Sequence, residues 1–237
     1  MQVRAAATDA SRVIMRNLTG PGVKLVLPTL LKGVSERAWR TKLASIELLG
    51  AMSNCAPSQL AASLPSIVPA LAGVLNDAHP KVAAAAAGSI DLVGAAIRNP
   101  EVAALTPKLI RAIADPVRAT KGALEALRDM VFVHTIDVSS LALILPVIGR
   151  GLKERNGESK KAAARILGNL ASLVGNSRDL APYVPALMPD LKSALIDALP
   201  DVRATAARSL GSLVRGLGQV RRLALQPAGL FHLTANN

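Results

Sequence analysis

The chain has 237 residues, of which 51% are apolar and only 2% aromatic, so alanine and leucine must form most of any core. Its formal net charge of +12 favours an anionic partner, such as RNA, an acidic protein surface or anionic lipid. The single cysteine, Cys55, excludes an intrachain disulfide and a cysteine-based metal cluster.

In chain order, the sequence predicts one helix, then five helix pairs, then a tail. The first helix covers 3–18 and is ended by Gly20-Pro21-Gly22, because glycine and proline interrupt helices. The pairs are expected at 23–34 with 38–54, 59–76 with 81–98, 101–114 with 116–130, 139–154 with 159–174, and 180–196 with 201–217. We therefore expect one continuous array over residues 1–218 and a frayed tail over 219–237, where the pattern is lost.

The first helix of every pair carries an internal proline, at Pro28, Pro69, Pro107, Pro146 and Pro189. These prolines follow one another at steps of 41, 38, 39 and 43 residues. A period near 40 with two helices per period is typical of HEAT and armadillo repeats. The sequence thus predicts an all-α solenoid of about five and a half helix pairs, whose curvature absorbs the bends at the prolines.

The second helices of the pairs share a pattern. SKKAAARILGNL (159–170) and DVRATAARSLGSL (201–213) each place a basic residue early and an arginine five positions later, followed closely by Leu-Gly. Small residues let two helices approach closely, and apolar residues three and four positions apart bury one stripe. Cys55 falls in such a second helix, where we expect a buried and unreactive thiol.

Basic residues recur at comparable places of these helices, and comparable places of a solenoid line up along one side. We expect a positive stripe that binds phosphate without reading sequence; the alternative is a solvated face whose arginines are partly neutralised by aspartates. Because aromatic residues for base stacking are not interleaved with these cations, structured RNA or an acidic protein is favoured over a single strand. The candidate contacts are Arg37, Arg40, Lys42, Arg118, Lys121, Lys160, Lys161, Arg165, Arg203 and Arg208.

Within this stripe, Lys160 and Lys161 are expected to be exposed, whereas Arg203 is expected to pair with an aspartate across the repeat. Aspartates recur in the turns between helices, where they can cap helix starts or pair with arginines of the next repeat. They are Asp77, Asp115, Asp197 and Asp201. This pattern indicates a structural role and not acid–base chemistry.

Trp39, the only tryptophan, is followed directly by Arg40. We favour a buried position between repeats over an exposed contact, because large aromatic side chains are usually mostly buried. His79 precedes a proline in a turn between helices and is expected to be solvated. His134 follows Phe132 between the third and fourth pairs, where packing or capping is expected.

Sequence motifs of catalysis are missing: there is no phosphate-binding glycine loop, no G-x-S-x-G and no H-E-x-x-H. We therefore expect no enzyme, no metal and no cofactor. The start MQVRAAATDASRVIM lacks the apolar run of a secretory signal, and prolines interrupt the uncharged stretch 48–76, so no membrane span is expected. A cytoplasmic location fits best.

Two stretches carry strings that generic HEAT repeats do not share. They are AWRTK followed by ELLGAM within residues 38–82, and FVHTIDVSSLAL within residues 132–155. On these strings the chain resembles the elongation-factor-three-like HEAT region of the general-control translational activator family. These large ribosome-associated proteins switch on the initiation-factor-two kinase in amino-acid starvation. The similarity runs from about Val3 to Gly218.

The resemblance implies a non-enzymatic scaffold that contacts ribosomes and a partner ATP-binding-cassette protein. The kinase-binding region of the family lies further toward the carboxyl end, so contact with the eIF2-alpha kinase is expected only through regions outside this chain. Fungal elongation factor three has a similar WRTK-type repeat, but its nucleotide-binding cassettes are not found here. Because the chain departs from the family after Gly218 into QVRRLALQPAGLFHLTANN, we expect a fragment or truncated product of a longer solenoid.

Two other classes of function stay open. A transport or coat-type HEAT solenoid would use the positive charge to bind acidic cargo proteins. An enzyme would resemble the lyases that use HEAT-like repeats, but the lack of a convergent polar cluster argues against that class.

Overall fold

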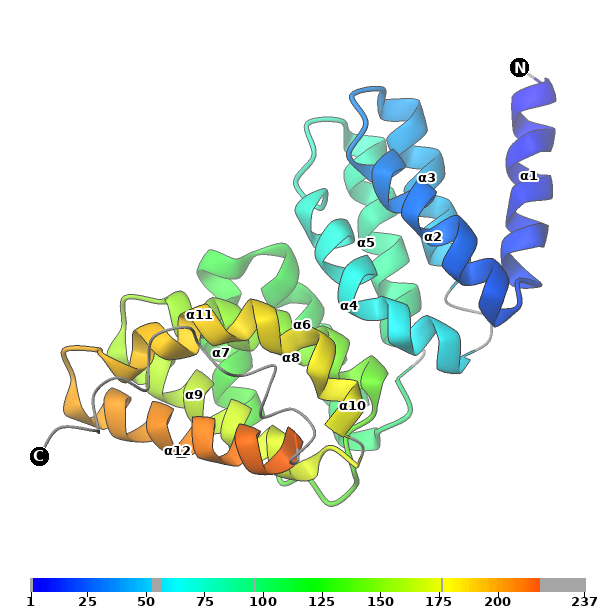
Figure 1. Ribbon diagram of the computed structural model, residues 1–237. Coiled ribbons are helices and arrows are strands. Elements are labelled where there is room, and N and C mark those ends of the chain that lie inside the picture. The colour runs from blue at the N-terminus through cyan, green and yellow to red at the C-terminus, as the bar shows by residue number, and fades with distance from the viewer. Residues whose placement is uncertain (1, 53–56, 96, 176, 218–237) are drawn as a thin grey trace, which may run out of the picture.

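The computed structural model describes residues 2–52, 57–95, 97–175 and 177–217, and this part of the chain is helical apart from turns and one isolated β-bridge between Ile136 and Val174 (Figure 1). The elements are α1 (Gln2–Arg16), α2 (Gly20–Val34), α3 (Trp39–Ala51), α4 (Pro57–Gly73), α5 (Pro80–Ala95), α6 (Pro100–Ala114), α7 (Pro116–Asp129), α8 (Val138–Lys153), α9 (Gly157–Leu173), α10 (Ser177–Leu180), the 3-10 helix η2 (Ala181–Tyr183), α11 (Val184–Leu195) and α12 (Pro200–Leu217). The predictions for Cys55 and for the tail 219–237 lie outside the described residues.

The predicted all-α solenoid of HEAT type is confirmed. Helix α1 stands before five pairs, α2–α3, α4–α5, α6–α7, α8–α9 and α11–α12, and the two helices of each pair pack against each other. The five aligned prolines all lie inside the first helices, in α2, α4, α6, α8 and α11.

Two details of the helix bounds differ from the prediction. The Gly20-Pro21-Gly22 segment forms the first turn of α2, because a proline near a helix start costs no hydrogen bond. The first helix of the fifth pair is divided into α10, η2 and α11, and Pro182 and Pro185 lie close to the divisions. Prolines likewise open α5, α6, α7 and α12.

Small residues bring the second helices close together, as predicted. A Cβ added at Gly50 of α3 would lie 3.2 Å from the Cα of Ser89 in α5. A Cβ added at Gly168 of α9 would lie 3.0 Å from the Cα of Ser209 in α12. The two serine hydroxyls donate across these contacts, from Ser89 to the carbonyl of Ile46 at 3.0 Å and from Ser209 to that of Ala164.

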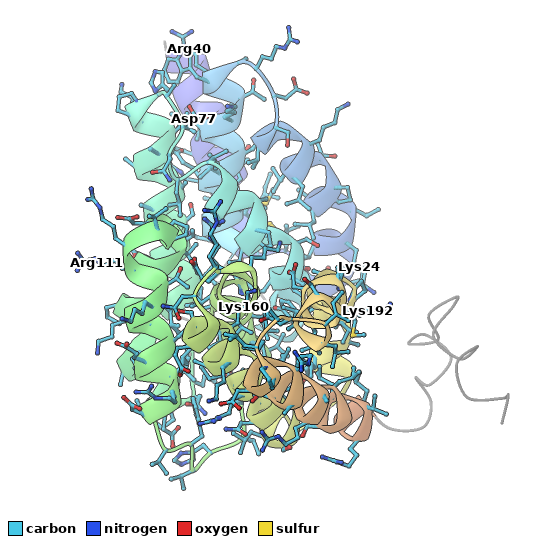
Figure 2. All side chains as sticks on the ribbon, turned by 90° about the vertical axis from the view of Figure 1, so that its left-hand side faces the viewer. Lys24, Arg40, Asp77, Arg111, Lys160 and Lys192 are labelled. Carbon is cyan, nitrogen blue, oxygen red and sulfur yellow. The ribbon has the colours of Figure 1, made fainter. Side chains whose placement is uncertain are left out.

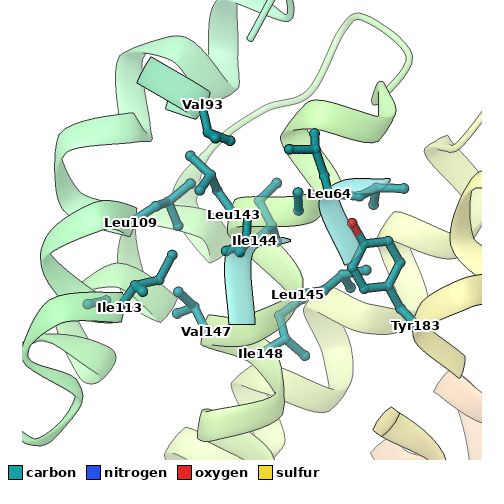
Figure 3. Packing of buried hydrophobic residues seen from close by; sticks show 14 of the residues in the cluster. Leu64, Val93, Leu109, Ile113, Leu143, Ile144, Leu145, Val147, Ile148 and Tyr183 are labelled. Atoms are coloured by element: carbon teal, nitrogen blue, oxygen red, sulfur yellow. The ribbon is translucent and has the colours of Figure 1, made fainter. Parts of the chain in front are cut away.

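Helix α8 interrupts the regular stacking. It packs against α4, α6, α7, α9 and α11, so it fills the centre of the molecule. Residues 141–145 with Val147 and Ile148 are at most 2% exposed. Figure 3 shows Leu64 of α4, Leu109 of α6 and Tyr183 of η2 gathered around this helix. A helix that is apolar on all sides is a buried one, and residues 141–148 of α8 have this character, whereas Arg150 and Lys153 in its last turn are exposed.

The consequence is a break in the row of second helices. In the described residues α3 packs on α5 and α7 packs on α9, but α5 and α7 do not pack side by side. The group α1–α5 and the group α6–α12 meet through α4 and α5 on one side and α6 and α8 on the other (Figure 1). Among the described residues, none of the helices has the length and apolar character needed to cross a membrane.

Candidate partner-binding surface

Three of the predicted contact lysines are committed to ion pairs. Lys42 lies 2.6 Å from Asp77, Lys160 lies 2.5 Å from Asp197, and Lys161 lies 2.8 Å from Asp201. Each pair joins a second helix to the turn or helix start of the following repeat. The expectation that Lys160 and Lys161 are exposed is wrong, since each side chain is only 24% exposed.

Asp77 and Asp197 occupy equivalent turns, Asp-Ala-His-Pro and Asp-Ala-Leu-Pro. In each turn the second carboxylate oxygen accepts the backbone N–H two residues later, from His79 at 2.9 Å and from Leu199 at 3.0 Å. The hydrogen bond from the lysine, together with this backbone N–H, lowers the pKa of both carboxyl groups. The two aspartates are therefore ionised structural links, and their partners are lysines of the preceding repeat where arginines of the next were expected.

The two predicted contact arginines of α12 bind backbone carbonyls. Arg203 donates to the carbonyl oxygens of Asp197 at 2.8 Å and Ala198 at 2.9 Å, in the turn before its own helix. Arg208 donates to the carbonyl of Ala204 at 3.2 Å. The expected pairing of Arg203 with an aspartate side chain across the repeat is thus replaced by contacts within one turn. Asp115 caps α7 as predicted, accepting the N–H of Arg118 at 3.3 Å.

Trp39 is half-buried and packs on the core from one end of α3. The ring of His79 stacks on it, with centroids 4.0 Å apart and planes 14° from parallel. The guanidinium carbon of Arg40 lies 4.6 Å from the Trp39 ring, within the range of a cation–π contact. His79 is therefore a packing residue and not the solvated turn residue that was expected. Trp39 is neither fully buried between repeats nor a fully exposed contact, the two alternatives considered for it.

A polar cluster that the sequence did not reveal lies at the start of α6. Glu101 accepts from the backbone N–H of Val133 at 3.2 Å and contacts Nδ1 of His134 at 2.7 Å. The hydrogen bond with His134 is the main reason that the pKa of Glu101 falls to about 2. Asn99 caps α6 and donates to the carbonyl of Thr135 at 3.2 Å, so the cluster fastens the segment after α7 to α6.

Exposed cations gather on the outer side of α6 and α7. Arg118 and Lys121 were predicted contacts, and α6 adds Lys108 and Arg111, which the sequence interpretation missed because it considered second helices only. Lys108, Arg111 and Arg118 line an open hollow of about 570 Å³. We call these four residues the α6–α7 basic surface.

The acidic residues beside this surface are only partly available to neutralise it. Glu125 and Asp129 line the same hollow. Asp129 is already bound by Arg128, whose Nε lies 2.8 Å from its carboxylate, and this contact lowers the pKa of Asp129. The four cations of the α6–α7 basic surface form no ion pair within the described residues. They are available to an anionic partner.

The predicted stripe is not continuous. Arg37 and Arg40 are exposed near the start of α3, and Arg165 is exposed on α9. Figure 2 shows Arg40 well separated from Arg111, which lies at the edge of the molecule. The gap arises because α5 and α7 do not pack side by side, so the second helices form two rows.

No group of three or more His, Cys, Asp and Glu side chains converges on a possible metal position within the described ranges.

Two family models match the chain. Residues 1–90 match the EF3 N-terminal HEAT repeat, and residues 118–223 match the elongation factor 3/GNC1 HEAT repeat. The chain is 48% identical over 217 residues to the stalled ribosome sensor GCN1 of Homo sapiens and 51% identical over 218 residues to the eIF-2-alpha kinase activator GCN1 of Dictyostelium discoideum. It is 28% identical over 216 residues to elongation factor 3A of Saccharomyces cerevisiae.

The matches cover most of this chain and little of the relatives. The two GCN1 alignments span 92% of this chain and 8% of each relative. The alignment with elongation factor 3A spans 90% of this chain and 21% of that protein.

Proposed function

Because this chain belongs to the elongation factor 3 and GCN1 family of HEAT-repeat proteins, we propose that it is a non-enzymatic scaffold segment of a ribosome-associated regulator of translation. Two of its relatives are named a stalled ribosome sensor and an eIF-2-alpha kinase activator. The segment holds the ribosome in the cytoplasm while other parts of a longer protein engage the kinase and an ATP-binding-cassette partner. It spans about 8% of the GCN1 relatives, which leaves room for those parts.

The α6–α7 basic surface is the observation that supports ribosome contact. Its arginines, Arg111 and Arg118, are exposed on two adjacent helices beside one hollow. Arginine presents a planar fork of donors that matches phosphate oxygens, and lysine adds a point charge. Fixed cations of this kind bind the phosphates of structured RNA without reading sequence. We therefore assign the surface to ribosomal RNA.

Ribosome pelleting at several salt concentrations tests this assignment. The variant Arg111→Gln with Arg118→Gln should pellet less with ribosomes than the parent chain. Removing one arginine–phosphate interaction should also lower the slope of log affinity against log salt by about 1, hence by about 2 for the double variant. Both residues are exposed, so helicity by circular dichroism should not change.

The matched control is Lys24→Gln with Lys192→Gln, which removes the same charge. In Figure 2 these two lysines lie on the opposite side of the molecule from Arg111. The control should pellet like the parent. Equally weakened pelleting of both double variants would show that net charge alone matters, and failure of the parent to pellet would remove ribosome binding from this segment.

A further inference from the structure

A second hollow lies between α7 and α9, and its floor is apolar. It has a volume of about 350 Å³, within the range of ligand pockets, and its buried lining includes Leu127, Ile166 and Leu170. Met130 and Phe132, from the segment after α7, complete the apolar lining. We call this the α7–α9 hollow. Neither repeat stacking nor the α6–α7 basic surface requires it.

The charged lining of the α7–α9 hollow has one sign. Arg128 and Arg165 are the charged residues that line it, and both are exposed. Arg128 uses Nε and Nη2 to hold Asp129, at 2.8 and 3.2 Å. Arg165 forms no ion pair or hydrogen bond within the described residues, so its whole guanidinium fork is available. A carboxylate next to an apolar group would therefore find a partner here.

Asn169 favours a peptide as the occupant. It is exposed one helical turn after Arg165 and lines the same hollow. Its carboxamide can donate to and accept from one peptide unit, which has the complementary pair of groups. Single-stranded nucleic acid would instead need aromatic platforms for its bases, and the only aromatic residue in the lining is the half-buried Phe132.

We propose that the α7–α9 hollow binds a short acidic–apolar peptide segment of a partner protein. A leucine-like side chain occupies the apolar floor, an adjacent carboxylate binds Arg165, and the peptide backbone bonds to Asn169. The shared contact area is small, so the interaction is weak on its own and gains strength from other contacts of a longer solenoid. This site is separate from the α6–α7 basic surface and does not depend on the proposed ribosome contact.

Fluorescence anisotropy of the full chain with a labelled decapeptide tests the proposal. The probe is a glycine–serine decapeptide with a central leucine flanked on each side by glutamate. One comparison peptide replaces the leucine by serine, another replaces both glutamates by glutamine, and a labelled ten-nucleotide single-stranded RNA is the third. We expect both peptide changes to weaken binding at least tenfold, because each removes one of the two recognised groups.

Variants of exposed residues locate the site. Asn169→Phe should fill the hollow and weaken binding of the probe at least tenfold, and Arg165→Gln should weaken it about five- to tenfold. Lys24→Gln, on α2 in the other helix group, is the matched charge control and should stay within twofold of the parent (Figure 1). Circular dichroism checks that the helix content of all three variants equals that of the parent.

Three results would overturn the proposal. The serine peptide could bind as well as the leucine peptide, or Asn169→Phe could leave binding unchanged. The RNA could bind more tightly than the probe and lose that binding in Arg165→Gln, which would assign the hollow to nucleic acid. The variant Arg111→Gln with Arg118→Gln should bind the probe peptide as tightly as the parent does. Loss of ribosome pelleting and loss of peptide binding can therefore be distinguished.

Discussion

A single methyl group at Gly168 tests the close approach of α9 and α12. The added Cβ would lie 2.9 Å from the hydroxyl oxygen of Ser209 and 3.0 Å from its Cα. The hydroxyl can rotate, but the Cα belongs to the backbone of α12, so the helices must move apart. Such overpacking costs about 1–3 kcal/mol, whereas alanine in place of glycine inside a helix gains about 0.5–1 kcal/mol. We expect Gly168→Ala to destabilise the chain by up to about 2.5 kcal/mol, the difference of the two effects.

Gly122 of α7 provides the matched control. An added Cβ there meets no atom within 4 Å, and the residue is exposed. Gly122→Ala should therefore stabilise by about 0.5–1 kcal/mol through helix propensity alone. Urea unfolding followed by far-ultraviolet circular dichroism compares the two variants with the parent. If Gly168→Ala raised stability as Gly122→Ala does, the close packing of α9 on α12 would be refuted.

Two further predictions concern carboxylates held by a basic partner. Lys160→Met should lower the thermal midpoint at pH 7, and the difference from the parent should shrink towards pH 3. The reason is that the pKa of Asp197 is lower in the folded chain than the ordinary aspartate value of about 3.9. Its ion pair therefore stabilises the fold fully above that value, and the stabilisation is lost as the pH falls towards the folded pKa. A difference in thermal midpoint that did not depend on pH would contradict the link. Glu101 should titrate near pH 2 in a carbon-detected NMR experiment, so its stabilising effect is complete above about pH 4.3 and lost as pH falls to 2. His134→Gln should move that titration upward, and an unchanged midpoint would show that His134 is not the cause.

The repeats and most helix bounds could be predicted because they depend on local chemistry. Prolines mark the first turns of α5, α6, α7 and α12, and asparagine or aspartate caps α6 to α9 through its side chain. These signals lie within a few residues of the boundary they define. The internal proline of each first helix gave the period directly. The family could be recognised for a similar reason, because the strings that carry the resemblance are short continuous segments of the sequence.

The candidate surface was harder to predict because exposure depends on distances between repeats. Lys160 and Arg165 lie five residues apart on one helix, yet Lys160 holds Asp197, whereas Arg165 forms no ion pair within the described residues. Whether a lysine pairs is decided by a turn 37 residues later, whose position no local pattern gives. Lys108 and Arg111 could have been found, since they are three residues apart on α6 beside the buried Leu109 and Ala112.

The buried position of α8 could be predicted in part from its sequence. Its segment SSLALILPVIG has no charged residue and no polar stripe, which indicates a helix surrounded by others. The spacing of the prolines, however, does not distinguish α8 from the first helices of the other pairs. The period gives the order of the repeats, whereas packing of α8 on α4 depends on side chains from both halves of the chain.

The α4–α8 contact changes how the chain should fold. In an array whose repeats touch only their neighbours, unfolding can begin at either end and proceed one repeat at a time. Here α4 packs on α8, although three helices lie between them in the sequence, so unfolding of α4 also removes contacts from α8. The contact also links distant parts of the chain, which slows folding because a long loop must close first. We therefore expect the helices around α8 to unfold more cooperatively than an array whose repeats touch only their neighbours.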